Sequence, residues 1–155
     1  MVARIGITGL GTMGGALALN IAERGFDVAI HNRSPARIAA TRDGAGPLAE
    51  RLVPAETPQA LAAALARPRA VLMMVPAGAA VDDTIAALLP HLDPGDILID
   101  GGNADYQDTE RRAAAMARAG MLYLGLGVSG GEEGARHGPS LMAGGDPRAW
   151  DAVAD

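Results

Sequence analysis

The segment GLGTMG, residues 9–14, is the feature that most restricts how this chain folds. It follows a short apolar run, Ala3–Thr8, and opens an Ala-rich stretch, Gly14–Arg24. A GxGxxG between a strand and a helix is typical of a βα turn that receives a pyrophosphate. Its first glycine allows the bend, its second lets the backbone approach the ligand, and its third lets helix and strand pack closely. The segment therefore predicts a dinucleotide-binding α/β fold.

Short β-branched and aliphatic runs alternate with Ala-rich stretches along the whole chain, which indicates repeated βαβ units. We expect one Rossmann-like, doubly wound domain over residues 1–155, with a mostly parallel sheet and helices on both faces. The predicted strands are Ala3–Thr8, Asp27–His31, a weak Leu52–Val53, Ala70–Val75, Asp96–Asp100, Met121–Gly125 and Ser140–Ala143. The predicted helices are Gly14–Arg24, Pro35–Asp43, Thr57–Arg67, Val81–Leu89, Asp105–Ala119 and one from Asp146 or Pro147 onward.

The composition argues against several classes of function. Lys plus Arg number 13 against 18 Asp plus Glu, and one Trp, two Tyr and one Phe leave few stacking platforms, so no nucleic-acid partner is expected. No apolar run approaches the roughly 18 residues that span a membrane. The absence of Cys fits a reducing compartment, and we expect a cytoplasmic protein. No pair of histidines has ligand spacing, and Asp82 and Asp83 suit a helix N-terminus, so no metal is expected.

The end of the second predicted strand selects the dinucleotide. A site that prefers NAD places Asp or Glu there, on the ribose hydroxyls. This strand instead leads into Asn32, Arg33 and Ser34, with Arg37 one helical turn further on, and Asp27 stands at its opposite end. Guanidinium, amide and hydroxyl donors suit a 2′-phosphate. The sequence therefore predicts NADP.

Glycine and small polar residues follow three later strands, at the sheet edge where ligands of open α/β sheets bind. The segments are VPAGAAVD, DGGNADY and GVSGGEEGARHGPSL, the last being Gly127–Leu141, of which we expect Gly127–Pro139 to be a loop with few buried contacts. Asn103 suits a substrate hydroxyl or a nicotinamide carboxamide. Ser129 with the amides of Gly130 and Gly131 forms a candidate nest for a carboxylate or hydroxyls. His137 is expected to be an exposed loop histidine.

Four segments together resemble one known family. GLGTMGGALALNIAERGF, HNRSPAR, GDILIDGGNADYQDTERR and GVSGGEEGARHGPSLMAGG are similar to the coenzyme domain of 6-phosphogluconate dehydrogenase, from about Ile5 to the last residue. The combination of EEGAR and GPSLM is the most specific part. The resemblance implies an NADP-dependent oxidation of 6-phosphogluconate at its C3 hydroxyl, followed by loss of CO2 to give ribulose 5-phosphate in the pentose phosphate pathway.

The resemblance also implies roles for individual residues. The residues expected at the cofactor are Gly9, Leu10, Gly11, Thr12, Met13, Gly14, Asn32, Arg33, Ser34, Arg37, Val75, Pro76, Ala77 and Asn103. The residues expected at the substrate are Asn103, Ser129, Gly130, Gly131 and Glu132, the last of them also facing the nicotinamide.

The chain departs from the family's pattern at three positions and in length. The family has lysine at Pro76, tyrosine at His137 and proline at Ala143. Its catalytic lysine and glutamate lie in a helical domain that would follow Asp155, so no catalytic residue is expected here. We expect the 155-residue chain alone to be inactive, and the full-length enzyme to be a homo-oligomer.

Two other functions remain open from the sequence. One is a stand-alone NADP-binding or sensing module without catalysis. The other is a different β-hydroxyacid dehydrogenase of the hydroxyisobutyrate type, or an imine reductase, because those families share the GLGxMG and SGG elements.

Overall fold

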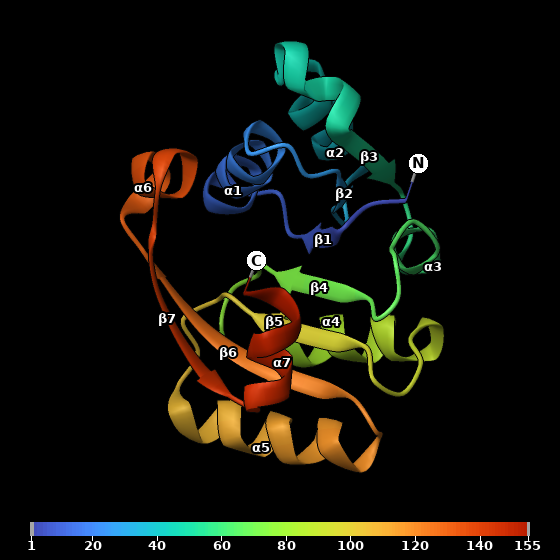
Figure 1. Ribbon diagram of the computed structural model, residues 1–155, viewed down its shortest axis with the longest axis vertical. Coiled ribbons are helices and arrows are strands. Elements are labelled where there is room, and N and C mark those ends of the chain that lie inside the picture. The colour runs from blue at the N-terminus through green and yellow to red at the C-terminus, as the bar shows by residue number, and fades with distance from the viewer. Residues whose placement is uncertain (1, 155) are drawn as a thin grey trace.

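The computed structural model describes residues 2–154 and contains a seven-stranded sheet in the order β3-β2-β1-β4-β5-β6-β7 (Figure 1). Every pairing is parallel except β6 with β7. The strands are β1 (Ile5–Thr8), β2 (Val28–His31), β3 (Leu52–Ala55), β4 (Ala70–Met73), β5 (Ile97–Asp100), β6 (Leu122–Ser129) and β7 (Ser140–Gly145). The α-helices are α1 (Thr12–Glu23), α2 (Pro35–Asp43), α3 (Pro58–Ala63), α4 (Ala79–Leu88), α5 (Tyr106–Arg118), α6 (Gly131–His137) and α7 (Pro147–Val153). Two 3₁₀ helices, η1 (Gly46–Arg51) and η2 (Leu89–His91), complete the list.

Helices cover both faces of the sheet, as the alternation of strands and helices predicts. One apolar layer joins the sheet to α1, α2, α6 and α7, and it includes Leu17, Ala135 and Ala149. The other joins it to α3, α4 and α5, with Ile85 and Met116 among its members. The strand order reverses between β1 and β4, which makes the carboxyl edge at these two strands the expected ligand crevice. The predicted doubly wound fold is confirmed.

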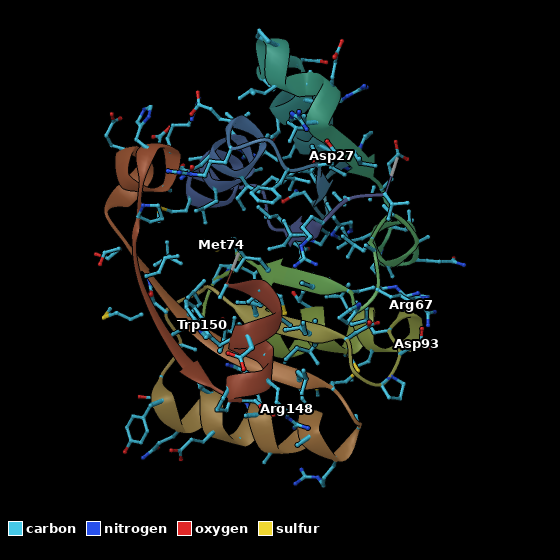
Figure 2. The ribbon with its side chains drawn as sticks, in the orientation of Figure 1. Asp27, Arg67, Met74, Asp93, Arg148 and Trp150 are labelled. Atoms are coloured by element: carbon cyan, nitrogen blue, oxygen red, sulfur yellow. The ribbon has the colours of Figure 1, made fainter. Side chains whose placement is uncertain are left out.

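Charged pairs fix the opposite, amino edge of the sheet. Arg69, just before β4, donates its Nη1 to Asp96 Oδ2 at 2.7 Å and to Asp93 Oδ2 at 2.8 Å. Arg67 also pairs with Asp93, and Figure 2 shows the two at one corner of the molecule. These contacts hold the starts of β4 and β5 together, away from the crevice.

The segment Gly127–Pro139 is not the loop that the glycine content predicts. Residues 127–129 extend β6, residues 131–137 form α6, and β7 then returns antiparallel to β6 (Figure 1). Tertiary contacts supply what the local sequence lacks: Ala135 is fully buried, and its carbonyl accepts a hydrogen bond from Asn20 Nδ2 at 2.9 Å. Arg136 pairs with Glu23 at 2.7 Å. Helix α1 therefore supports α6.

Within residues 2–154, no helix combines the length and apolarity that crossing a bilayer requires. The same residues contain no group of three or more His, Cys, Asp or Glu side chains placed to hold a metal ion.

Candidate functional site

The glycine turn between β1 and α1 has the geometry of a phosphate cradle. Gly9 has φ 95°, and a Cβ there would collide with the carbonyl oxygen of Met74. A Cβ on Gly14 would collide with the carbonyl of Gly9, whereas a Cβ on Gly11 would meet nothing within 4 Å. Gly9 and Gly14 are therefore required by close packing, and Gly11 faces open space. Met74, labelled in Figure 2, forms the floor beneath this turn.

Backbone and side-chain hydrogen bonds hold the turn against β2. The amide of Gly9 donates to His31 O at 3.0 Å, and the amide of Leu10 donates to Asn32 Oδ1 at 2.9 Å. Helix α1 has no side-chain cap at Gly11 and no acidic residue in its first turn. Its first-turn amides and positive dipole end therefore remain available to an anion.

The predicted 2′-phosphate residues occupy the end of β2 and the start of α2. Asn32 uses its carboxamide within the protein, accepting from Leu10 and donating to Ser34 O at 3.4 Å. Its first role is to support the turn. Arg33, Ser34 and Arg37 are exposed.

Arg37 lies on the wall of an open groove of about 640 Å³, which Gly11 and Thr12 also line. A phosphate in this groove can therefore contact the guanidinium of Arg37 and the N-terminal end of α1. Asp27 stands at the other end of β2, where it pairs with Arg51 at 3.2 Å (Figure 2). It takes no part in this groove.

The first turn of α6 forms another wall of the same groove. Glu132, Glu133 and Arg136 line it. Glu132 therefore lines the same groove as Gly11. Its expected contact with the nicotinamide stays a prediction.

The turn after β5 places Asn103 between the ends of β5 and β6. Asn103 has φ 54°, and its side chain accepts from Val128 N at 3.1 Å and donates to Val128 O at 3.4 Å. A carboxamide has two donors and two acceptor lone pairs, so half of its capacity remains for a ligand. Val75, Pro76 and Ala77 follow β4 next to this turn, because a Cβ on Gly102 would lie 2.5 Å from Val75 O.

The predicted substrate residues follow Val128 directly. Ser129, Gly130 and Gly131 are exposed, and the two glycines have φ 124° and 63°, in the region that glycine adopts without strain. Through Val128, Asn103 is therefore joined to the start of the Ser129–Gly131 segment. His137 lies at the far end of α6, exposed and 3.6 Å from Glu133.

Sequence reasoning missed a buried ionic cluster behind this edge. Arg112 of α5 is 1% exposed and contacts Asp82 of α4, while Asp100 and Tyr123 lie beside it. The Arg112 guanidinium and then Arg111 hold the pKa of Asp82 far below its usual range. One signal was present in the sequence: Arg112 is four residues before the apolar Met116, hence on the same helix face.

Comparison with known proteins gives a consistent result. The family model described as the NAD binding domain of 6-phosphogluconate dehydrogenase matches residues 4–155. A chloroplastic decarboxylating 6-phosphogluconate dehydrogenase of Oryza sativa is 53% identical over 155 residues, which cover 98% of this chain and 30% of the rice protein. The chain thus spans about a third or less of the curated relatives it matches.

Two solved structures are similar in fold. A Plasmodium falciparum 6-phosphogluconate dehydrogenase, studied in its apo form, with its cofactor NADP+ and with its substrate 6-phosphogluconate, superposes with a TM-score of 0.90 at 41% identity, over 97% of this chain and 32% of that one. A 3-hydroxyisobutyrate dehydrogenase from Mycobacterium tuberculosis gives a TM-score of 0.81 at 27% identity, over 99% of this chain and 50% of that one. The hydroxyisobutyrate-type proteins are the more distant relatives.

Proposed function

The chain belongs to the 6-phosphogluconate dehydrogenase family, and from this membership we propose that it is the NADP-binding domain of a decarboxylating enzyme of that family. The enzyme as a whole oxidises 6-phosphogluconate and releases ribulose 5-phosphate and CO2. The observation that carries the proposal is the open glycine turn at the uncapped end of α1, with Arg37 on the wall of the same groove.

The residues of the adenosine side fit a phosphorylated dinucleotide. Gly11 lets the pyrophosphate reach the first-turn amides of α1, and the Arg37 guanidinium offers paired donors to a 2′-phosphate. Arg33 and Ser34 add exposed donors at the start of α2. Asn32 holds the turn in shape through the Leu10 amide. No carboxylate stands among residues 32–37, directly after β2.

The residues of the other side fit a nicotinamide and a sugar acid. Val75, Pro76 and Ala77 flank the cofactor, and the free half of the Asn103 carboxamide binds a polar group of cofactor or substrate. Ser129, Gly130 and Gly131 offer a hydroxyl and backbone amides to the substrate's hydroxyls or carboxylate. When bound, NADP supplies the acceptor for the hydride that leaves the substrate.

We expect cofactor binding by this chain to occur without catalytic turnover. We expect the 155-residue chain to bind NADP but not to oxidise 6-phosphogluconate, because the resemblance puts the catalytic lysine and glutamate outside it and proton transfer requires a positioned base. The homo-oligomeric assembly and cytoplasmic location expected from the sequence also stay predictions.

Isothermal titration calorimetry tests the proposal. We expect NADP to bind more tightly than NAD, and 6-phosphogluconate to bind weakly in the presence of NADP. Failure to bind either dinucleotide overturns the proposal. Binding of 3-hydroxyisobutyrate in preference to 6-phosphogluconate would instead support a β-hydroxyacid dehydrogenase of the hydroxyisobutyrate type. Formation of NADPH by the purified chain contradicts the expected separation and makes Glu132 and His137 the first residues to replace.

A further inference from the structure

The buried ionic cluster lies directly behind the two turns expected to hold the nicotinamide half of the cofactor, yet the proposed function assigns it no role. Arg112 donates its Nε to Asp82 Oδ1 and its Nη2 to Asp82 Oδ2, both at 3.0 Å. Nη2 also donates to Gly78 O at 2.9 Å. A buried charge is costly even when it is paired, so its retention calls for a reason beyond stability.

One side of the cluster controls the turn after β4. Gly78 directly follows Val75–Ala77 and precedes α4. Its carbonyl and the Asp82 carboxylate are bound by the same guanidinium nitrogen, Nη2. Arg112 therefore fixes the end of the turn and the first part of α4 as one unit.

The other side of the cluster controls the turn after β5. Arg112 Nη1 lies 3.6 Å from Asp100 Oδ2 and is the one buried side-chain polar atom in residues 2–154 without a hydrogen-bond partner. Asp100 Oδ1 accepts from Gly102 N at 3.1 Å, and Asp100 Oδ2 accepts from Tyr123 OH at 3.1 Å. Asp100 thus holds the turn that leads into Asn103, and the positive charge of Arg112 lies next to its carboxylate.

Three members of the cluster, Arg112, Asp82 and Tyr123, have shifted pKa values. The hydrogen bond between Arg112 and Asp82 raises the pKa of Arg112 and lowers the pKa of Asp82. Burial, followed by the charge of Asp100, raises the pKa of the Tyr123 hydroxyl. These shifts keep Arg112 and Asp82 charged and Tyr123 neutral near neutral pH, which suits the three residues to hold geometry.

The adenosine side of the cradle packs on the carbonyl of Met74, and its hydrogen bonds to the end of β2 are Gly9 N to His31 O and Leu10 N to Asn32 Oδ1. None of these groups belongs to the cluster. Loss of the cluster should therefore disturb one half of the site and spare the other.

We propose that Arg112 is a positioning residue for the nicotinamide half of the cofactor, acting through Gly78 and Asp100 to hold the Val75–Ala77 and Gly101–Asn103 turns together. The proposal rests on the proposed function, because it takes NADP as the ligand. Arg112 itself touches neither cofactor nor substrate in this scheme.

Two ligands separate positioning from general stability: NADP, and 2′,5′-ADP, which carries only the adenosine half. The variants are Asp82→Asn, which removes the charge of a half-exposed partner, and Arg112→Lys, which keeps the charge but loses the planar fork. Asp83→Asn is the matched control, since Asp83 is exposed on the same helix and forms no ion pair among residues 2–154.

We expect both variants to weaken the binding of NADP about 3- to 30-fold and to change the binding of 2′,5′-ADP by less than about twofold, with the control unchanged. Equal weakening of both ligands, or of neither, overturns the proposal.

Amide hydrogen exchange without ligand gives a second test that does not depend on cofactor binding. In Asp82→Asn we expect faster exchange at Gly102, whose amide is bonded to Asp100, and unchanged exchange at Leu10, whose amide is bonded to Asn32. Unchanged exchange at Gly102, or equal acceleration at both amides, also overturns the proposal. If unmodified protein binds neither ligand, the proposed function fails, and the exchange result alone decides whether Arg112 positions these turns.

Discussion

The Asn103 side chain binds both backbone polar groups of Val128, accepting from its amide at 3.1 Å and donating to its carbonyl at 3.4 Å. It does so from a backbone with φ 54°, which asparagine tolerates better than most residues. This one residue therefore joins the turn after β5 to the end of β6, immediately before the expected substrate residues.

Replacing Asn103 should separate hydrogen bonding from backbone strain. We expect Asn103→Ala to lower the free energy of unfolding by about 1–2 kcal/mol, from two lost hydrogen bonds and a strained φ. Asn103→Gly loses the same hydrogen bonds, but glycine adopts a positive φ without strain, so it should be the less destabilising change. Urea denaturation measures both. A glycine variant less stable than the alanine variant would show that the relief of strain is smaller than the entropy cost of glycine in the unfolded chain.

Replacing Arg37 or Arg33 should change the cofactor preference. We expect Arg37→Ala to weaken NADP binding by about 1.5–3 kcal/mol and to leave NAD nearly unchanged, since only NADP offers a phosphate to its guanidinium. Arg33→Ala should act in the same direction. Titration calorimetry with both cofactors measures the effect. Arg42→Ala is the control, because Arg42 is exposed on the same helix but does not line the groove. Equal losses for NADP and NAD argue against a 2′-phosphate contact.

Helix α6 should depend on one buried hydrogen bond from α1. We expect Asn20→Ala to cost about 1–3 kcal/mol, because it leaves the buried Ala135 carbonyl unpaired. Exchange at Gly134 and Gly138, whose amides bond within this segment, should accelerate while β4 and β5 stay protected. Glu23→Gln is the comparison, since it weakens only an exposed pair with Arg136 and should have little effect. If Glu23→Gln accelerates amide exchange in α6 and Asn20→Ala does not, the ion pair between Glu23 and Arg136 supports the helix instead.

His31 should make stability depend on pH. Burial lowers the pKa of its imidazole below the usual 6.5, so the unfolded chain binds the proton at a higher pH than the folded chain. Between these two pKa values the unfolded state carries more protons, and stability falls as the pH drops from about 6.5. The loss levels off below the folded pKa.

Thermal unfolding between about pH 5 and pH 8 measures this contribution. His31→Asn should flatten the decline while keeping a side-chain partner for Thr8 Oγ1, which lies 2.8 Å from His31 Nδ1. His137→Asn, at an exposed histidine, should keep the decline. Parallel curves for unmodified protein and His31→Asn would assign the pH dependence to other groups.

The fold was predictable where local pattern and tertiary structure agree. The buried run at β4 and the glycine turn before α1 each carry their own signal, since neighbouring residues dictate a strand or a bend. The carboxyl edge followed from topology alone, because parallel strands bring their ends together. Asp27 was correctly placed away from this edge on the same reasoning.

Two features depended on residues far apart in the chain and were not predictable. The glycines around α6 indicate a loop, yet Asn20 supports that helix from 115 residues away. The spacing of Arg112 from Met116 places it on the apolar face of α5, but its ionic partners come from α4 and β5, which no local pattern indicates. In both cases the deciding contact lies outside any local window.

The hydrogen bond from Leu10 to Asn32 also bears on how this domain can evolve. Asn32 supports the glycine turn through its side-chain oxygen, and aspartate carries an oxygen at the same position. A carboxylate there would keep the bond from Leu10, lose the donor to Ser34 O, repel a 2′-phosphate and accept from ribose hydroxyls. Codons for the two amino acids differ by a single base. A single substitution at this position should therefore shift the preference from NADP toward NAD while keeping the bond that shapes the turn.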